Sequence, residues 1–313
     1  MHFENRTYPV PANHMYLLDH AYGDIFSLPD DIGLHFEHVD RHALAEAEAN
    51  FIREYIERGI SAWPAERYRV NSMKNVAVVV AGGSGTRMGQ DIPKQFINVF
   101  DKHVLIYTLE SFQRHPDVDA IAVVCIDGWQ TMVDAYAKQF NIDKLQWIVP
   151  GGGSVQESIR NGVEHLEYEL DPEDIVIIHD GIRPLIDADV LTDVIQVCER
   201  YGNAVTSLPY NEQIFVINQD DPSTTVQYVP REQLRRVSTP QAYRYGKLLA
   251  AYRKAFKENI GIHGSSYTNT MMVDLGETLH FAKGSDKNIK LTTKGDLELF
   301  KAYITADEDT WLK

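Results

Sequence analysis

A glycine-rich loop followed by two cations is the part of this sequence best suited to chemistry. Residues 81–89 read Ala-Gly-Gly-Ser-Gly-Thr-Arg-Met-Gly, and a lysine follows at position 94. Glycines let a backbone approach a ligand closely and turn its N–H groups toward phosphate oxygens. Arg87 and Lys94 add two positive charges, as a polyphosphate requires. The candidate binding residues within the loop itself are Ala81, Gly82, Gly83, Ser84, Gly85 and Thr86.

The spacing inside this loop excludes two common phosphate-binding patterns. A P-loop closes with Gly-Lys-Ser or Gly-Lys-Thr, which this loop lacks, and a dinucleotide fingerprint requires glycine or alanine where Met88 stands. The pattern that remains, with Lys94 seven residues beyond Arg87, is typical of sugar nucleotidyltransferases. If the glycines only formed a tight turn, the two cations would be unexplained.

A second glycine turn lies at residues 151–153, between a strand-like run and a helical pattern. Gly152 and Gly153, together with Ser158 on the following helix, are candidates for contact with a nucleotide. The alternative is an ordinary strand–helix connection in which Ser154 caps the helix. The turn alone leaves both interpretations open.

Asp180 directly follows His179 at the end of an apolar run over residues 175–178. A carboxylate at the end of a strand, beside a phosphate loop, is well placed to hold Mg²⁺, which favours one or two carboxylates plus phosphate oxygens. The alternative is a turn or cap residue. We expect His179 to pack or to hydrogen-bond rather than to catalyse.

Two later stretches offer charged side chains of lower specificity. Residues 229–234 read Val-Pro-Arg-Glu-Gln-Leu and present Arg231 beside a rigid turn, and residues 284–293 contain Asp286 and Lys290. Without the glycine turns and Asp180, either stretch would pass as a solvated loop.

The elements that must position these residues alternate along the chain after residue 73. Such alternation predicts βαβ units, and hence a mostly parallel sheet with helices on both faces. Ligands then bind at the carboxyl ends of the strands, where the glycine loop falls. We expect strands at 76–80, 120–126, 146–149, 175–178 and 204–208, and helices at 105–114, 130–140, 155–166 and 188–201.

Composition limits the class of protein. The 313 residues have a net charge of −15, which argues against a nucleic-acid surface. Cys125 and Cys198, the two cysteines, fall in apolar patterns and are expected to be buried thiols. The opening residues lack a leader pattern and no apolar stretch reaches membrane-spanning length, so we expect a cytoplasmic protein without a membrane span.

Taken together and in this order, the motifs resemble the cytidylyltransferases that act on polyol phosphates. That family includes the 2-C-methyl-D-erythritol 4-phosphate enzyme of isoprenoid biosynthesis and the ribitol-5-phosphate enzyme of cell-wall and capsule synthesis. The resemblance covers residues 74 to about 305. It implies an α/β, Rossmann-like nucleotidyltransferase fold that uses CTP and Mg²⁺. It also implies a homodimer joined by a β-arm at about residues 209–245.

The resemblance further implies a role for each candidate residue. Arg87 and Lys94 would stabilise the triphosphate, while the backbone of residues 81–85 and Ser158 would hold the nucleotide. Asp180, with Asp286, would hold the metal. Lys290 and Arg231, the latter reaching in from the partner subunit, would grip the substrate phosphate. The reaction would convert CTP and a polyol phosphate to a CDP-polyol and pyrophosphate, which demands positioning and charge stabilisation rather than a general base.

Several positions depart from the isoprenoid enzyme's pattern. Val155 stands where an arginine is usual, Gly153 where an acid is usual, and Gln213 where the arm offers a threonine to the substrate. A Thr-Asp-Glu-like run reads Thr-Asn-Thr at residues 268–270. These changes concern the polyol pocket and the base contacts. We therefore expect ribitol 5-phosphate first, methylerythritol 4-phosphate second and glycerol 3-phosphate third. The competing interpretations are a catalytically silent interaction module and a transferase that uses another nucleotide on a sugar 1-phosphate.

Residues 1–73 form a separate N-terminal extension in this interpretation. A helical pattern runs from about residue 40 to 59, and residues 61–65 read as a linker to the domain at 74–313. Residues 8–29 resemble the closing segment of LicD-type phosphotransferases, which attach phospho-alditol groups to surface glycans. That resemblance favours a surface polymer and a downstream phosphotransferase as partner; an unrelated helical cap is the alternative.

Overall fold

The computed structural model describes residues 2–3, 6–7, 74–83, 92–264 and 267–306. The chain divides into two compact units, Met1–Ser72 and Met73–Lys313. In the first unit the described residues form two short antiparallel strands, β1 (His2–Phe3) and β2 (Arg6–Thr7). The expected helix at about 40–59 and the segment resembling LicD-type enzymes lie outside the described residues.

The described part of the second unit contains a seven-stranded sheet in the order β13-β9-β12-β8-β3-β6-β7. All neighbouring pairs are parallel except the two that β12 makes with β8 and β9. The strands are β3 (Asn75–Ala81), β6 (Ala120–Cys125), β7 (Leu145–Pro150), β8 (Ile175–Asp180), β9 (Asn203–Pro209), β12 (Arg235–Arg244) and β13 (Phe281–Lys283). The sheet is therefore mostly parallel, as the sequence predicts. Every strand expected from the sequence is present, with ends shifted by at most two residues.

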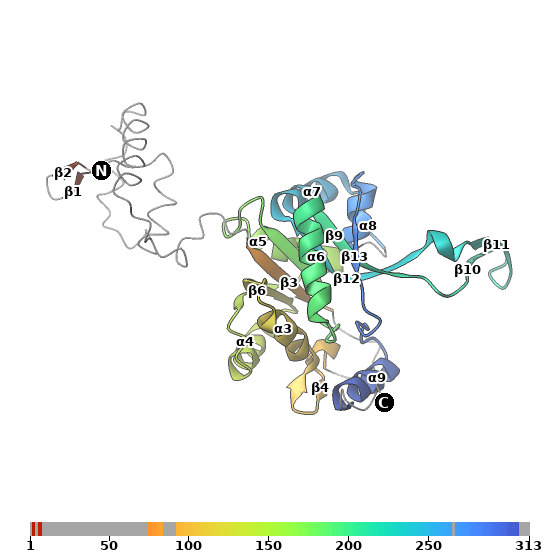
Figure 1. Cartoon of the computed structure of the whole chain (residues 1–313), viewed down its shortest axis with the longest axis horizontal. Helices are drawn as coiled ribbons and strands as arrows, with labels where there is room; N and C mark the ends of the chain where they lie inside the picture. Colours follow the sequence, from red (N-terminus) through yellow and green to blue (C-terminus); the bar gives the residue numbers. More distant parts are fainter. Residues whose placement is uncertain (1, 4–5, 8–73, 84–91, 265–266, 307–313) are drawn as a thin grey trace. The chain divides into compact units, whose positions relative to one another are not determined.

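Helices cover both faces of the sheet (Figure 1). Successive residues of a strand point to opposite faces, so Val79 packs against one helical layer and Val78 against the other. The layer on the Val79 side comprises α3 (Val104–Arg114), α4 (Gln130–Gln139) and α6 (Ala188–Tyr201). The layer on the Val78 side comprises α5 (Val155–His165), α7 (Tyr245–Glu258) and α8 (Thr268–Asp274). Cys125 and Cys198 are buried free thiols, as predicted.

A smaller apolar cluster lies around the last helix, α9 (Lys294–Thr305). Phe300 of α9 is fully buried and packs with Val99, Val104, Ile182 and Leu291. This cluster joins α9 to the segment that holds the short helix η4 (Lys94–Phe96) and the strands β4 (Asn98–Val99) and β5 (Lys102–His103). It also reaches the turn after β8, because Ile182 belongs to that turn.

A hairpin projects from the body of this unit (Figure 1). Its strands, β10 (Ile214–Ile217) and β11 (Thr225–Val229), pair antiparallel with each other, and the short helix η5 (Arg231–Gln233) follows. Five of its apolar side chains are exposed: Phe215, Val216, Ile217, Val226 and Tyr228. The hairpin occupies the middle of the range expected for the arm. The end of that range, β12, lies instead in the main sheet between β8 and β9.

Candidate active site

The two glycine turns lie side by side at the carboxyl ends of β3 and β7. A Cβ added to Gly82 would lie 3.0 Å from Ser158 Oγ, and one added to Gly151 would lie 3.2 Å from the same oxygen and 3.7 Å from Gly82 Cα. The Ser158 hydroxyl accepts a hydrogen bond from the Gly152 N–H (3.0 Å) and donates one to the Ser154 carbonyl (2.8 Å). The close approach therefore favours residues without Cβ, and the Ser158 hydroxyl lies between the two turns.

The structure confirms the helix-cap interpretation of the second turn. Ser154 caps α5, accepting a hydrogen bond from the Glu157 N–H at 3.1 Å, and Glu157 accepts one from the Gly153 N–H at 2.7 Å. Gly152 is closely packed, since an added Cβ would come within 2.4 Å of the Glu157 side chain. The same residues therefore form a helix cap and a closely packed turn, and their contact with a nucleotide stays a prediction.

Gln95 shapes the first turn, although the sequence assigned it no role. Its amide nitrogen donates to the Ala81 carbonyl at 2.6 Å and to the Gly83 carbonyl at 3.0 Å, and its side chain is buried. Lys94, immediately before it, begins η4. Ser84, Gly85, Thr86 and Arg87 lie outside the described residues. Gln95 therefore fixes where β3 ends and the predicted phosphate loop begins.

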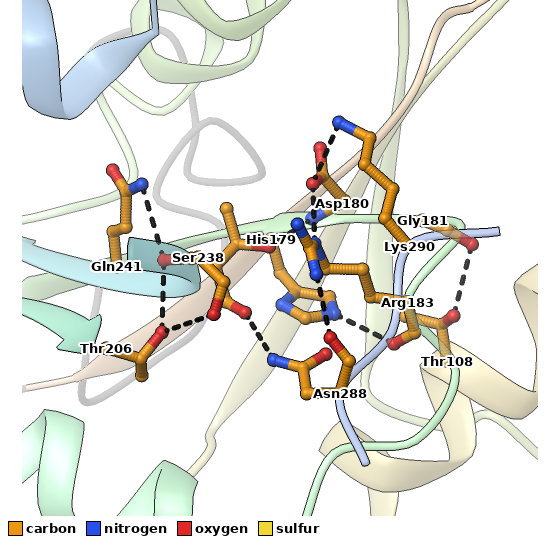
Figure 2. Close-up of polar contacts among 11 residues, drawn as sticks. Thr108, His179, Asp180, Gly181, Arg183, Thr206, Ser238, Gln241, Asn288 and Lys290 are labelled. Carbon is orange, nitrogen blue, oxygen red and sulfur yellow. Dashed lines mark hydrogen bonds and ion pairs between the residues drawn. The ribbon is translucent and has the colours of Figure 1, made fainter. Parts of the chain in front are cut away.

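Asp180 stands at the carboxyl end of β8 and gathers two cations (Figure 2). Its Oδ2 lies 2.9 Å from Arg183 Nε and 3.1 Å from Lys290 Nζ. Burial would raise the pKa of the Asp180 carboxyl, but the positive charges of Lys290 and Arg183 outweigh burial and hold the pKa below its ordinary value. Asp180 is thus an ionised carboxylate in a net positive environment, which suits an anionic ligand.

Arg183 and Asn288 complete this cluster, and the sequence analysis assigned neither to the site. Arg183 Nη1 donates to the Asn288 carbonyl at 2.7 Å, while the Asn288 amide donates to the Thr239 carbonyl at 2.6 Å (Figure 2). The turn after β8, the segment before Lys290 and strand β12 are therefore tied together by two side chains. The Arg-Pro that follows His-Asp-Gly-Ile in the sequence was the available signal for Arg183.

His179 is buried beneath the site and faces away from its charged rim. Its Nε2 lies 3.0 Å from the Arg183 carbonyl, and because a carbonyl only accepts, Nε2 must carry the proton. Burial, the largest influence, lowers the pKa of His179 to about 4. A buried neutral imidazole bonded to backbone fits the packing role expected from the sequence.

A pocket opens between the glycine turns and the cation cluster. Its lining joins the ends of β3 and β8, the first turns of α5 and α8, and β12. The lining residues are Val80, Val155, Ile159, Ile178, Asp180, Thr239, Gln241, Tyr267 and Thr268. Four of these residues are aliphatic, and Asp180 is the one that carries a charge.

The remaining candidates lie on or near the projecting hairpin. Arg231 in η5 is exposed, 3.4 Å from Glu232 Oε1 and 3.4 Å from the Asn211 carbonyl. Gln213 is exposed just before β10. Asp286 is 82% exposed at its side chain and pairs with Arg236 of β12. Within one chain, Arg231, Gln213 and Asp286 therefore lie on the arm or at its base and do not line the pocket.

The donor set at the site fits a metal ion held mainly by a ligand's phosphates. No group of three or more histidine, cysteine, aspartate or glutamate side chains within the described ranges could hold a metal by itself. Mg²⁺ in nucleotide enzymes uses one or two carboxylates and completes its shell with phosphate oxygens and water. The ionised Asp180 supplies such a carboxylate.

A mostly parallel α/β sheet with two glycine turns and a cation-bound aspartate at its carboxyl edge matches the fold and site expected of a nucleotidyltransferase. Residues 75–306 match the family described as IspD, 2-C-methyl-D-erythritol 4-phosphate cytidylyltransferase. The chain belongs to this family and is a cytidylyltransferase, as the sequence motifs predict.

Relatives of both kinds named above are found. A ribitol-5-phosphate cytidylyltransferase of Lacticaseibacillus paracasei is 58% identical over 232 residues, which is 74% of this chain and 98% of that protein. A 2-C-methyl-D-erythritol 4-phosphate cytidylyltransferase of Clostridium novyi is 36% identical over 232 residues, 74% of this chain and 96% of that protein. The crystal structure of 4-diphosphocytidyl-2C-methyl-D-erythritol synthase from Anaerococcus prevotii is 21% identical and superposes with a TM-score of 0.63 over 75% of this chain and 100% of its own. This last likeness shows the fold.

Within the described ranges, none of the helices combines the length and the apolar character needed to cross a bilayer.

Proposed function

We propose that this enzyme transfers the cytidylyl group of CTP to D-ribitol 5-phosphate and releases pyrophosphate. We choose ribitol 5-phosphate because the chain is 58% identical to a ribitol-5-phosphate cytidylyltransferase over nearly the full length of that enzyme. The chemistry rests on Asp180 and the two cations that pair with it, Arg183 and Lys290, at the end of β8 next to the end of β3.

The proposed reaction is a single displacement at the α-phosphorus of CTP. A phosphate oxygen of ribitol 5-phosphate attacks that phosphorus, a new P–O bond forms, and the bond to the β-phosphate breaks so that pyrophosphate leaves with its electron pair. The attacking oxygen is already anionic at neutral pH, so no side chain needs to remove a proton. Catalysis then consists of alignment and of stabilising the charge that builds up on the phosphates.

Each candidate residue has a place in this scheme. The backbone of residues 81–85 with Gly152, Gly153 and Ser158 would hold CTP, and Arg87 with Lys94 would neutralise its phosphates. Asp180 would hold Mg²⁺, which when bound neutralises and orients the triphosphate. Asp286, the second predicted ligand, would have to leave its ion pair with Arg236 to reach the metal. Lys290 would receive the phosphate of the polyol.

Arg231 and Gln213 would act in the site of a partner subunit. The hairpin that bears them exposes Phe215, Val226 and Tyr228, and an isolated two-stranded hairpin is only marginally stable in water. Packing against a second copy would bury these side chains in a two-fold contact. We therefore propose a homodimer in which each arm completes the neighbouring site.

The N-terminal extension at 1–73 would be separate from the chemistry of the domain at 74–313. We propose that the product feeds a phosphotransferase acting on a surface polymer, and that the enzyme works in the cytoplasm, where CTP is made. Methylerythritol 4-phosphate is the second candidate, because the family match and the clostridial relative carry that name.

The test is pyrophosphate release with CTP, UTP, ATP and GTP crossed with ribitol 5-phosphate, methylerythritol 4-phosphate and glycerol 3-phosphate, with and without Mg²⁺. We expect the highest kcat/KM with CTP and ribitol 5-phosphate, and mass spectrometry should detect CDP-ribitol. Lys290→Ala should lower turnover strongly, whereas Lys301→Ala, an exposed lysine of α9, should not. Higher kcat/KM with methylerythritol 4-phosphate would replace the proposed polyol, and no release with any pair would reject the proposal.

A further inference from the structure

Tyr267 lies at the rim of the pocket, against the lysine proposed to receive the polyol phosphate. The Lys290 ammonium is 5.4 Å from the centroid of the Tyr267 ring, within the range of a cation–π contact. Tyr267 also lines the pocket that contains Asp180, and its side chain is 43% exposed. Tyr267 therefore lines the pocket and also makes a cation–π contact with Lys290.

The backbone of Tyr267 is fixed by the first turn of α8. Thr270 Oγ1 accepts from the Tyr267 N–H at 2.9 Å and donates to the Tyr267 carbonyl at 3.0 Å. The Thr270 hydroxyl thus hydrogen-bonds both the N–H and the carbonyl of Tyr267. The Met271 N–H donates to the same carbonyl at 2.9 Å.

The next residue, Thr268, anchors this turn in the core. Tyr252 OH donates to Gln156 Oε1 at 3.0 Å, so Thr268 must donate its own hydroxyl proton to Tyr252 OH, 2.7 Å away. All three side chains are buried, and the Gln156 amide donates to the Gly261 carbonyl. This buried network connects α5, α7 and α8, and it fixes the backbone position from which the Tyr267 side chain extends.

Lys290 needs such a support because a lysine side chain is long and flexible. Lys290 also pairs with the carboxylate of Asp180, 3.1 Å away, which offsets its charge. An aromatic ring attracts an ammonium group without carrying a net charge and without taking its N–H donors in directed hydrogen bonds. The ring can therefore restrict Lys290 while leaving it able to bind an anion.

We propose that the Tyr267 ring is a positioning residue that holds Lys290 for the phosphate of the polyol substrate. The inference rests on the proposed function in one respect, namely the assignment of Lys290 to that phosphate. Tyr267 acts through Lys290, so its removal weakens capture of the polyol phosphate and leaves capture of CTP unchanged.

The test compares Tyr267→Leu, which removes the aromatic ring, with Tyr267→Phe, which keeps it. We expect Tyr267→Leu to raise KM for the polyol phosphate about five- to tenfold, the size of an ordinary cation–π contact. KM for CTP should change less than about twofold, and Tyr267→Phe should restore most of the affinity. Tyr168→Leu, at a tyrosine that is 94% exposed, controls for the loss of a surface ring.

A double-mutant cycle with Lys290→Gln shows whether the effect passes through Lys290. In that background, Tyr267→Leu should raise KM for the polyol phosphate by less than about twofold, because the contact is already lost. Additive effects, an equal rise in KM for CTP, or a Tyr267→Phe variant as weak as Tyr267→Leu would each overturn the proposal. Thermal melting of every variant identifies a loss of folding, which would lower the apparent kcat without raising KM. A fall in kcat with no rise in KM for the polyol phosphate would also overturn the proposal.

Failure of the proposed function would appear earlier, in the wild-type enzyme. The cycle is measured with whichever polyol phosphate the wild type converts best. A different preferred polyol would correct the proposed substrate and leave the Tyr267 comparison intact.

Discussion

The buried histidine beneath the site makes the stability of this domain depend on pH in a calculable way. His179 is fully buried against Phe112, with ring centroids 5.3 Å apart, and its pKa is lowered to about 4. Burial is the largest cause; the Arg183 carbonyl and Asp180 oppose it, while the charges of Arg183 and Lys290 add to it. The folded protein therefore keeps this imidazole neutral at pH values where an unfolded chain would protonate it.

The sign and size follow from proton linkage. In an unfolded chain the histidine pKa is about 6.5, so between about pH 6.5 and 4 the unfolded state binds more protons than the folded state. The stability that depends on a neutral His179 is complete above about pH 6.5 and is lost as the pH falls toward 4. Between pH 7 and pH 5 the loss amounts to about 2 kcal/mol of the free energy of unfolding.

The assay is urea denaturation at pH 7 and pH 5 for the wild type, His179→Gln and His165→Gln. Glutamine keeps an N–H donor for the Arg183 carbonyl but does not titrate. From pH 7 to pH 5, the wild type and His165→Gln, an exposed control, should lose about 2 kcal/mol more than His179→Gln loses. If His179→Gln loses as much as the wild type, the reasoning about burial is refuted.

Further predictions concern turnover, assembly and packing. Arg87→Ala and Lys94→Ala should each lower kcat by roughly a hundredfold or more with folding intact, the usual cost of a preorganised charge contact; near-normal kcat would remove that residue from the site. Arg231→Ala and Lys94→Ala dimers, each nearly inactive, should regain about a quarter of wild-type activity after subunit exchange, because half the dimers then hold one complete site; no recovery despite exchange would place Arg231 in cis. A protein starting near residue 73 should retain CTP turnover. Phe300→Ala, in a fully buried position, should lower the free energy of unfolding by about 3–5 kcal/mol in urea titrations.

The sheet could be predicted because its central strands are short apolar runs. Residues 76–79 and 120–125 are buried on both faces, so their sequences are continuous apolar runs rich in β-branched residues. Strand β12 escaped prediction because only Pro240–Tyr243 are buried, the buried part begins with a proline, and the exposed half begins with two arginines. The signal for α7 was available: Leu248, Tyr252 and Ala255 recur at helical spacing and are all buried.

The sequence predicts those parts of the site that depend on residue type and order. It does not predict those that depend on contacts between side chains and distant segments of the chain. Glycine turns and the aspartate after β8 stand out in the sequence. Gln95 does not, because its function is to donate to two carbonyls on another segment. Asn288 is likewise an unremarkable loop residue until the fold brings it to Arg183 and Thr239.

The spacing of the charged groups depends on packing that is remote from them in sequence. Ile182 lies between Asp180 and Arg183, Leu291 directly follows Lys290, and the Leu291 N–H donates to the Ile182 carbonyl at 2.9 Å. Both side chains are buried against Phe300 of α9. Since interiors are close-packed, a change at Phe300 must shift Ile182 and Leu291, and with them the two cations around Asp180. Helix α9 therefore supports the geometry of the site through the packing of Phe300, and Phe300→Ala should lower kcat/KM under conditions in which the protein is still folded.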